Sequence, residues 1–138
     1  RSTYIRILYR TKNGLYPLWN DSRWEKIKKN VLHVLYYLLS NKNRTFFNKY
    51  LFSESSRYIV IPEYVPFLIK SGYKTCLVIF DLEEKRETHV SCVENGSIIP
   101  LAFEDTSSDR QIVYHKYIGG FTREFVHEIS KLKNWKKF

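Results

Sequence analysis

The residues best suited to acid and base chemistry lie near the C-terminal end of the chain. His115 and Lys116 precede a Gly119-Gly120 pair, and Arg123 and His127 follow it. RNA cleavage by internal attack of a 2′-hydroxyl needs a base, an acid for the leaving oxygen, and cations that hold the phosphate. In this hypothesis His115 and His127 share the acid and base roles, and Lys116 and Arg123 hold the phosphate. Strand alternation would point His115 and Lys116 to opposite faces, so only one of them can join a single site.

A second set of residues is acidic and has the ligand type of a Mg²⁺ site. Its members are Glu63, Asp81, Glu94 and the run Glu83-Glu84-Lys85. Two-metal nucleases bind Mg²⁺ through carboxylates at strand ends and place a lysine beside the phosphate. Here Asp81 and Glu83 fall in one hairpin turn, a spacing that suits a charged surface loop better. We therefore predict no metal site.

Motifs for cofactors and covalent catalysis are absent. The chain has no Gly-x-Gly-x-x-Gly or Gly-x-x-x-x-Gly-Lys-Ser/Thr loop, and no Gly-x-Ser-x-Gly, so we predict no cofactor. The four histidines are scattered, and a zinc site would need assembly from distant residues. Cys76 and Cys92 are too few for a disulfide scaffold and lack Cys-x-x-Cys spacing, which indicates a reducing compartment or indifference to redox conditions.

Charge and aromatic content favour binding to a polyanion. The net charge is +9, and residues 1–52 account for all of it. Eleven tyrosines, nine phenylalanines and three tryptophans often alternate with basic residues, as in Arg57-Tyr58. Stacked bases and neutralised phosphates are how single-stranded nucleic acid is held. The candidate binding residues are Arg6, Arg10, Lys12, Arg23, Lys26, Lys28, Lys29, His33, Tyr37, Lys42 and Arg44. The alternative is an ordinary solvated surface.

Positioning these groups requires an N-terminal strand and helices. Thr3 to Arg10 alternates as a strand, and Ser22 to Ser40 has a capping box and helical apolar spacing. A shorter helix is expected over Arg44 to Phe52, and Pro62 is expected to start another turn of helix that Gly72 closes. The helix Ser22 to Ser40 would present its basic and aromatic flank to a phosphate backbone.

The rest of the chain predicts an antiparallel meander. Cys76 to Phe80 is an unbroken apolar run, expected at the centre of the sheet with both faces covered. Asn95-Gly96 is the strongest hairpin motif, and Pro100 requires an edge strand or a bulge. A helix capped by Thr122 would close the chain at about Lys136. The predicted class is α+β: N-terminal helices packed on a mostly antiparallel sheet, with a closing C-terminal helix.

These observations predict a basic domain that binds RNA or single-stranded nucleic acid. At 138 residues one domain is expected, without a membrane partner, located inside the cell in the cytoplasm, and excised from a larger polypeptide. One alternative is a metal-independent ribonuclease, broadly similar in order of elements to small ribonuclease toxin domains. Another is a protein-interaction domain, in which the acidic stretch Asp81 to Asp109 and the basic N-terminal segment dock on other domains of the same polypeptide.

Overall fold

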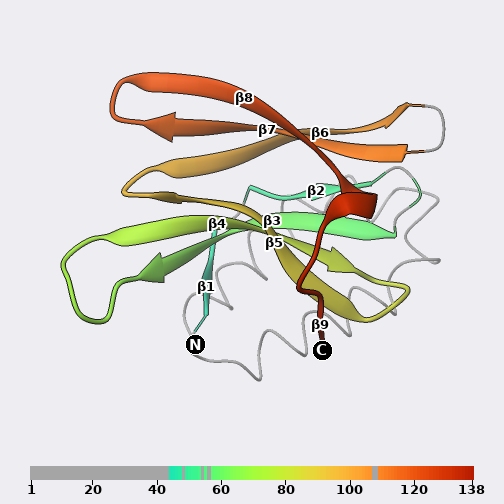
Figure 1. The fold of residues 1–138 in the computed structure, drawn as a ribbon, viewed down its shortest axis with the longest axis horizontal. Helices are drawn as coiled ribbons and strands as arrows, with labels where there is room; N and C mark the ends of the chain where they lie inside the picture. Colours follow the sequence, from blue (N-terminus) through green and yellow to red (C-terminus); the bar gives the residue numbers. More distant parts are fainter. Residues whose placement is uncertain (1–43, 48, 54, 56, 107–108) are drawn as a thin grey trace.

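The computed structural model describes residues 44–47, 49–53, 55, 57–106 and 109–138. Within these ranges the chain is almost entirely β-strand, with a single short 3₁₀ turn, η1 (Figure 1). The elements are β1 (Thr45–Phe46), β2 (Leu51–Phe52), β3 (Tyr58–Pro66), β4 (Tyr73–Asp81), β5 (Arg86–Glu94), β6 (Ser97–Thr106), β7 (Asp109–Ile118), β8 (Phe121–Glu128), η1 (Ile129–Lys131) and β9 (Lys136–Lys137).

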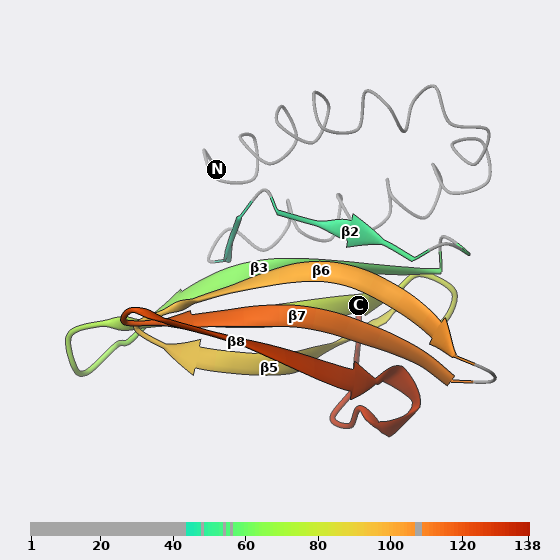
Figure 2. The ribbon, with the colours of Figure 1, turned by 90° about the horizontal axis from the view of Figure 1, so that it is seen from above.

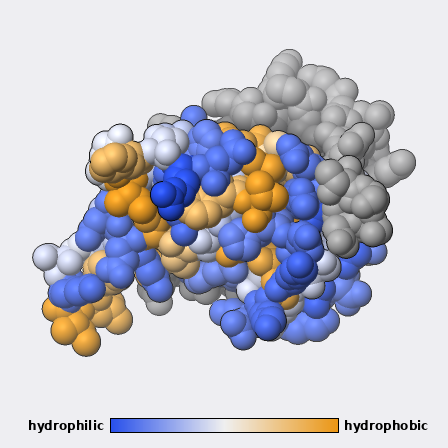
Figure 3. Space-filling model, turned by 45° about the horizontal axis from the view of Figure 1, so that its top comes forward, coloured by the Kyte–Doolittle hydropathy of each residue, from blue (hydrophilic) through white to orange (hydrophobic). Residues whose placement is uncertain are grey.

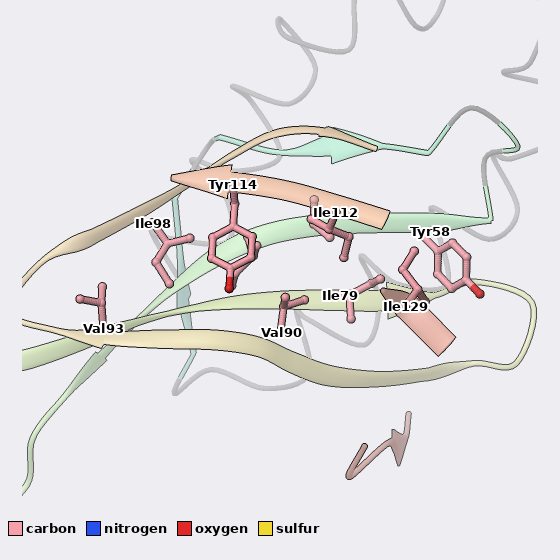
Figure 4. Close-up of a cluster of buried hydrophobic side chains, with 10 residues drawn as sticks. Tyr58, Ile79, Val90, Val93, Ile98, Ile112, Tyr114 and Ile129 are labelled. Atoms are coloured by element: carbon pink, nitrogen blue, oxygen red, sulfur yellow. The ribbon is translucent and has the colours of Figure 1, made fainter. Parts of the chain in front are cut away.

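Two antiparallel sheets form the described part of the chain. In the larger sheet β4 lies between β3 and β5, β1 and β2 both pair with β3, and β9 pairs with β5. The smaller sheet has the order β6-β7-β8. The smaller sheet lies over the larger one in Figure 1, and Figure 2 shows the same arrangement from above. A buried cluster that includes Leu77, Ile79, Ile112 and Tyr114 fills the space between the sheets (Figure 4).

Strand β4 has both of its faces covered, as the sequence predicts. Leu77 and Ile79 belong to the cluster between the sheets. Val78 and Phe80 point the other way and pack in a second cluster with Phe46. All four side chains have no exposed surface, and β4 lies at the centre of its sheet. The prediction of a central strand is confirmed.

The turns between strands also follow the sequence. Asn95 has φ 49° and, with Gly96, joins β5 to β6; a Cβ added at Gly96 would lie 2.4 Å from the carbonyl oxygen of Tyr117. The residue pair therefore supplies both a positive φ and a close approach that a larger side chain would block. Pro100 lies on β6, an edge strand of its sheet, beside an irregularity in the pairing with β7. Both expectations for this region are confirmed.

The α+β class is wrong, and the predicted closing helix is the clearest error. Thr122 lies in β8, which pairs with β7 from Gln111↔Glu128 to Ile118↔Phe121. Gly119 has φ 60° and allows the tight turn that brings the two strands together. Aromatic and β-branched residues such as Phe125 and Val126 suit a strand as well as an amphipathic helix, and the neighbouring strand decides between them. The residues after β8 form η1 and β9.

Two shorter helix predictions are also wrong. The range expected as a helix over Arg44 to Phe52 contains β1 and β2, and each pairs with β3. Pro62 starts no helix, because it lies within β3 opposite Leu77. Proline cannot donate to a ladder, but the Pro62 carbonyl accepts a hydrogen bond from the Phe47 amide at 2.9 Å. The pairing with β4 continues past Pro62 and sets the local structure.

Some predicted elements lie outside the described residues. The strand Thr3 to Arg10 and the helix Ser22 to Ser40 belong to this group. Among the residues that the structure describes, no helix has the length and apolar character needed to cross a membrane.

Candidate functional site

A cleft of about 460 Å³ opens where β3, β5 and β7 begin and η1 follows β8. Figure 1 shows how these chain segments meet at one end of the fold. Three guanidinium groups line it, from Arg57, Arg86 and Arg110. Two aromatic side chains, Tyr58 and Trp135, also line it. Planar cations beside aromatic rings are the groups with which proteins hold phosphates and bases.

Asp81 at the end of β4 fixes two of these arginines. Its carboxylate has no exposed surface and accepts hydrogen bonds from Arg57 Nε and Nη2, both at 3.0 Å. Arg86 Nε donates to the same carboxylate at 3.2 Å. The backbone amides of Glu83 and Glu84 also donate to Asp81 Oδ1, each at 3.2 Å. A buried acid with this many donors holds both guanidinium groups in place before any ligand arrives.

The ionisation of this group of residues is stable at neutral pH. Burial alone would raise the pKa of Asp81, but the hydrogen bonds from Arg57 and the Glu84 amide outweigh burial and hold the pKa below its ordinary value of 3.8. The hydrogen bond to Asp81 in turn raises the pKa of Arg57. Burial raises the pKa of Tyr58. The cleft therefore presents a charged Arg57 and a neutral Tyr58 phenol.

Aromatic rings support all three guanidinium groups. Arg86 lies over the Trp135 ring with its central carbon 4.3 Å from the centroid. Arg57 and Arg110 lie over the Tyr58 ring at 5.1 Å and 6.0 Å. Arg110 also donates to the Ser55 hydroxyl. These contacts restrict the arginine side chains and leave a planar, positively charged lining.

The four predicted catalytic residues all lie on the β7 and β8 hairpin, but they do not converge. Lys116 pairs with Arg123 across the two strands, and His127 lies opposite Ile112. Strand alternation therefore puts Lys116, Arg123 and His127 on one face. His115 lies on the other face, where its Nε2 is 3.2 Å from Glu124 Oε1. The structure brings three of the four residues to one side and leaves His115 apart, as alternation predicted for His115 and Lys116.

Of these two histidines, His127 is the one in contact with a fully buried side chain. Its Nδ1 is 2.9 Å from the hydroxyl of Tyr114, whose side chain is fully buried between the sheets. Burial lowers the pKa of His127, and the positive charge of Lys116 lowers it further. Burial also lowers the pKa of Lys116. A histidine of this kind is neutral at physiological pH and can accept a proton.

Most of the predicted nucleic-acid-binding residues lie outside the described ranges. Arg44 is the exception, and its side chain is only 11% exposed. Its Nε donates to Glu63 at 2.8 Å, and its Nη1 donates to Glu87 at 2.9 Å. Burial opposes the charge of Arg44, but hydrogen bonds to these two carboxylates outweigh it and raise the pKa. Little of this side chain is left for a phosphate. The residues outside the described ranges are Arg6, Arg10, Lys12, Arg23, Lys26, Lys28, Lys29, His33, Tyr37 and Lys42.

The acidic set considered for Mg²⁺ is divided among separate cations. Asp81 holds Arg57 and Arg86, whereas Glu63 holds Arg44 on a different part of the sheet. Glu94 lies 3.3 Å from Lys70 in an exposed pair. These carboxylates neutralise side chains of the protein and do not form a common site.

Sequence reasoning identified only a fragment of the cleft. Arg57-Tyr58 was noted as one of several alternations of basic and aromatic residues, but Arg86, Arg110 and Trp135 were not singled out. Arg86, Arg110 and Trp135 are 29 to 78 positions beyond Arg57 in the sequence, and only strand pairing brings them to one end of the molecule. The buried Asp81 at the end of an apolar run was the available indication, because a charge there requires a cationic partner.

Comparisons with known proteins identify no relative, so the function must be inferred from the geometry of the site. No family model, no curated protein and no solved structure matches the chain.

Proposed function

We propose that this protein binds RNA or single-stranded nucleic acid, and that the cleft lined by Arg57, Arg86 and Arg110 contacts the phosphate backbone. The observation that carries the proposal is the grouping of three arginines with Tyr58 and Trp135 around one opening. A backbone phosphate accepts several hydrogen bonds at once, and guanidinium groups meet that geometry better than ammonium groups do.

The arginines combine preorganisation with access to solvent. Arg57 is 30% exposed and Arg86 is 34% exposed, although both are bound to Asp81. A guanidinium has five N–H donors, so the two bonds to Asp81 do not use all those of Arg57. Because their positions are already fixed, little side-chain entropy is lost when a phosphate binds.

The aromatic groups favour unpaired over paired nucleotides. Trp135 is partly exposed, and Arg86 lies over one side of its ring. A base can therefore stack against this pair of side chains. Base stacking on an aromatic side chain contributes about 1–3 kcal/mol per base. Bases within a duplex are not available for such contact. Most of the described surface that is visible in Figure 3 is hydrophilic, which is consistent with a polar ligand.

Local charge makes the proposed contact moderate in strength. Asp81 and Glu83 offset part of the positive charge of the three arginines, and Glu83 Oε2 lies 3.6 Å from Arg57 Nε. The net charge of +9 in residues 1–52 supplies a further attraction for a polyanion. Binding should therefore weaken with salt, as it does wherever phosphates are neutralised.

Fluorescence anisotropy of a labelled single-stranded RNA tests this function with Arg86→Ala and Arg110→Ala. Each substitution should weaken binding about tenfold, because a hydrogen bond to a charged group contributes about 1.5 kcal/mol. Each should also reduce the slope of log K against log salt by about 0.7. A duplex of the same sequence should compete poorly.

Lys70→Ala is the matched control, because it removes one positive charge from an exposed pair with Glu94 at the far end of the larger sheet. Its binding should equal that of the unchanged protein. Equal losses for Lys70→Ala and Arg110→Ala would mean that only total charge matters, and the cleft would be excluded. A chain that binds no nucleic acid at low salt would favour docking on another protein domain.

A metal-independent ribonuclease is the second candidate, favoured by the shared face of Lys116, Arg123 and His127. His127 would act as the base and the two cations would hold the phosphate. The same RNA, analysed on a denaturing gel in the presence of EDTA, tests it. Cleavage that persists in EDTA and disappears in His127→Ala would support this activity. Intact RNA after prolonged incubation would leave binding alone.

An intracellular, cytoplasmic location belongs to the same proposal, because RNA is abundant there. Fractionation of cells that express the chain would test it.

A further inference from the structure

A second group of chemically active side chains lies on the opposite face of the larger sheet from the core between the sheets. Cys76 on β4 and Cys92 on β5 are directly opposite each other and form a disulfide. His89 lies beside them, with Nδ1 3.8 Å from Cys92 Sγ. One ligand atom from each of the three residues lies within 4.8 Å of the others. The sequence does not predict this pairing, because two cysteines without a paired motif indicate a reducing compartment or indifference to redox conditions.

An irregularity in β5 brings His89 and Cys92 to the same face. Residues three apart on a regular strand point to opposite faces. Here Leu77 pairs with Ser91 and its neighbour Val78 pairs with His89, so Val90 is an extra residue in β5. The bulge shifts the alternation by one residue, and His89 and Cys92 then face the same way. The packing of Val90 into the core between the sheets agrees with this assignment.

Glu63 supports His89 from the neighbouring side. Its Oε1 is 3.6 Å from His89 Nε2, the ring nitrogen that does not face the cysteine. Arg44 holds the same carboxylate by two hydrogen bonds, from Nε at 2.8 Å and Nη2 at 3.0 Å. Histidines that bind metals almost always direct their second nitrogen to such a carboxylate or to a carbonyl. Glu63 therefore orients His89 with Nδ1 toward the sulfur atoms.

We propose that the reduced protein binds a zinc ion through Cys76 Sγ, Cys92 Sγ and His89 Nδ1. Tetrahedral zinc places a sulfur and a nitrogen ligand about 3.6 Å apart, close to the 3.8 Å between Cys92 and His89. The sulfur atoms would separate to about 3.8 Å after reduction. Water would complete the coordination, because the side chain of His89 is 46% exposed. A cleft of about 280 Å³, lined by His89 and Glu87 among others, opens to solvent beside the histidine ligand.

The disulfide and the zinc complex are alternative states of the same two cysteines. A phosphine reductant transfers two electrons to the disulfide, the Sγ–Sγ bond breaks, and the phosphine becomes its oxide by taking oxygen from water. Two thiols result, and each releases its proton to the buffer when zinc binds, because thiolates are the ligands. This site is separate from the arginine cleft, so the proposal does not depend on nucleic-acid binding.

Cobalt(II) is the probe for the test, because it takes the place of zinc and its thiolate complexes absorb in the near ultraviolet. The whole chain is reduced with a phosphine, titrated with cobalt, and then with zinc as a competitor. We expect a thiolate band that saturates at one equivalent of cobalt and that zinc abolishes. The oxidised chain should show no band.

Variants separate a built site from incidental binding to thiols. His89→Ala should weaken cobalt binding at least tenfold and change the visible spectrum, because one nitrogen ligand is lost. Glu63→Gln should weaken it about 10- to 100-fold, the usual effect of a lost outer partner. Cys76 is fully buried, so circular dichroism must first establish that Cys76→Ser folds. The exposed His89 keeps the test decisive if Cys76→Ser does not fold.

His115→Ala is the matched control, because His115 also faces a glutamate, Glu124 at 3.2 Å, but lies on the other sheet without a cysteine beside it. It should bind cobalt as the unchanged protein does. Absence of a thiolate band in the reduced chain, or unaltered binding in His89→Ala, would overturn the proposal.

Discussion

Asp81 and Glu63 are two buried carboxylates that hold arginines, yet their surroundings differ in access to solvent. Asp81 binds Arg57 and Arg86, which are about one third exposed and line a cleft. Glu63 binds Arg44, which is 11% exposed and shared with the buried Glu87. The same type of ion pair, between a carboxylate and a guanidinium, thus serves two purposes. Where the guanidinium reaches water it can bind an anion, and where it is enclosed it positions a neighbour such as His89.

This difference shows why an arginine cannot be assigned a role from its charge alone. Arg44 belonged to the residues expected to bind nucleic acid, and its two acidic partners occupy it. Arg86 and Arg110 were not singled out, and they line the open cleft. Desolvation and partner geometry decide which cations remain available for a ligand.

The strongest test of this comparison is Asp81→Asn. The substitution removes the charge that Arg57 and Arg86 share while it keeps the shape of the side chain. We expect the free energy of unfolding to fall by about 3 kcal/mol, because one partner of a buried ion pair is lost. Urea denaturation measures this change. A loss below the error of the measurement would mean that the two arginines are stabilised by solvent and by their aromatic partners instead.

Glu63→Gln should have a smaller effect on stability. Arg44 retains its ion pair with Glu87 at 2.9 Å, so its charge stays compensated. We expect a loss of about 1–2 kcal/mol in the same denaturation experiment, with RNA binding unchanged. A larger loss than that of Asp81→Asn would reverse the comparison and make the enclosed cluster the dominant one.

The smallest expected difference between Asp81 and Glu63 is in the acid pH range over which each loses its contribution to stability. The pKa of both carboxyl groups is lowered by folding, from ordinary values of 3.8 for Asp81 and 4.5 for Glu63. Burial opposes this shift in each case. Hydrogen bonds from Arg57 outweigh burial at Asp81, and the nearby His89 together with the hydrogen bonds from Arg44 outweighs it at Glu63. Such groups contribute stability that is fully present above the ordinary values and is lost as the pH falls through the lowered ones.

Unfolding free energies measured from pH 6 down to pH 2 would test this pH dependence. In each single variant the free energy of unfolding should fall less steeply as the pH is lowered. The difference should lie at slightly lower pH for Asp81→Asn than for Glu63→Gln, and the double variant should show both differences. An unchanged decline in the double variant would assign acid sensitivity to other carboxylates.

Local sequence predicted those features whose cause is local. Asn95-Gly96 makes a hairpin because only a few residues adopt a positive φ easily, and Pro100 disturbs a ladder because it has no amide hydrogen. The apolar run from Cys76 to Phe80 predicted a central strand for a similar reason, since such a run needs cover on both faces. The helical pattern after Thr122 failed, because its residues also suit a strand and the hairpin at Gly119 supplies a partner.

The sequence alone determined the net charge, its concentration in residues 1–52, the tight turns and the central strand of the sheet. Tertiary structure alone decided which of the described cations are open to solvent, that the two cysteines meet, and on which faces His89, His115 and His127 lie. The physical reason is that strand pairing joins residues far apart in the sequence, and one extra residue in β5 reverses the direction of every side chain beyond it. No local pattern contains that information.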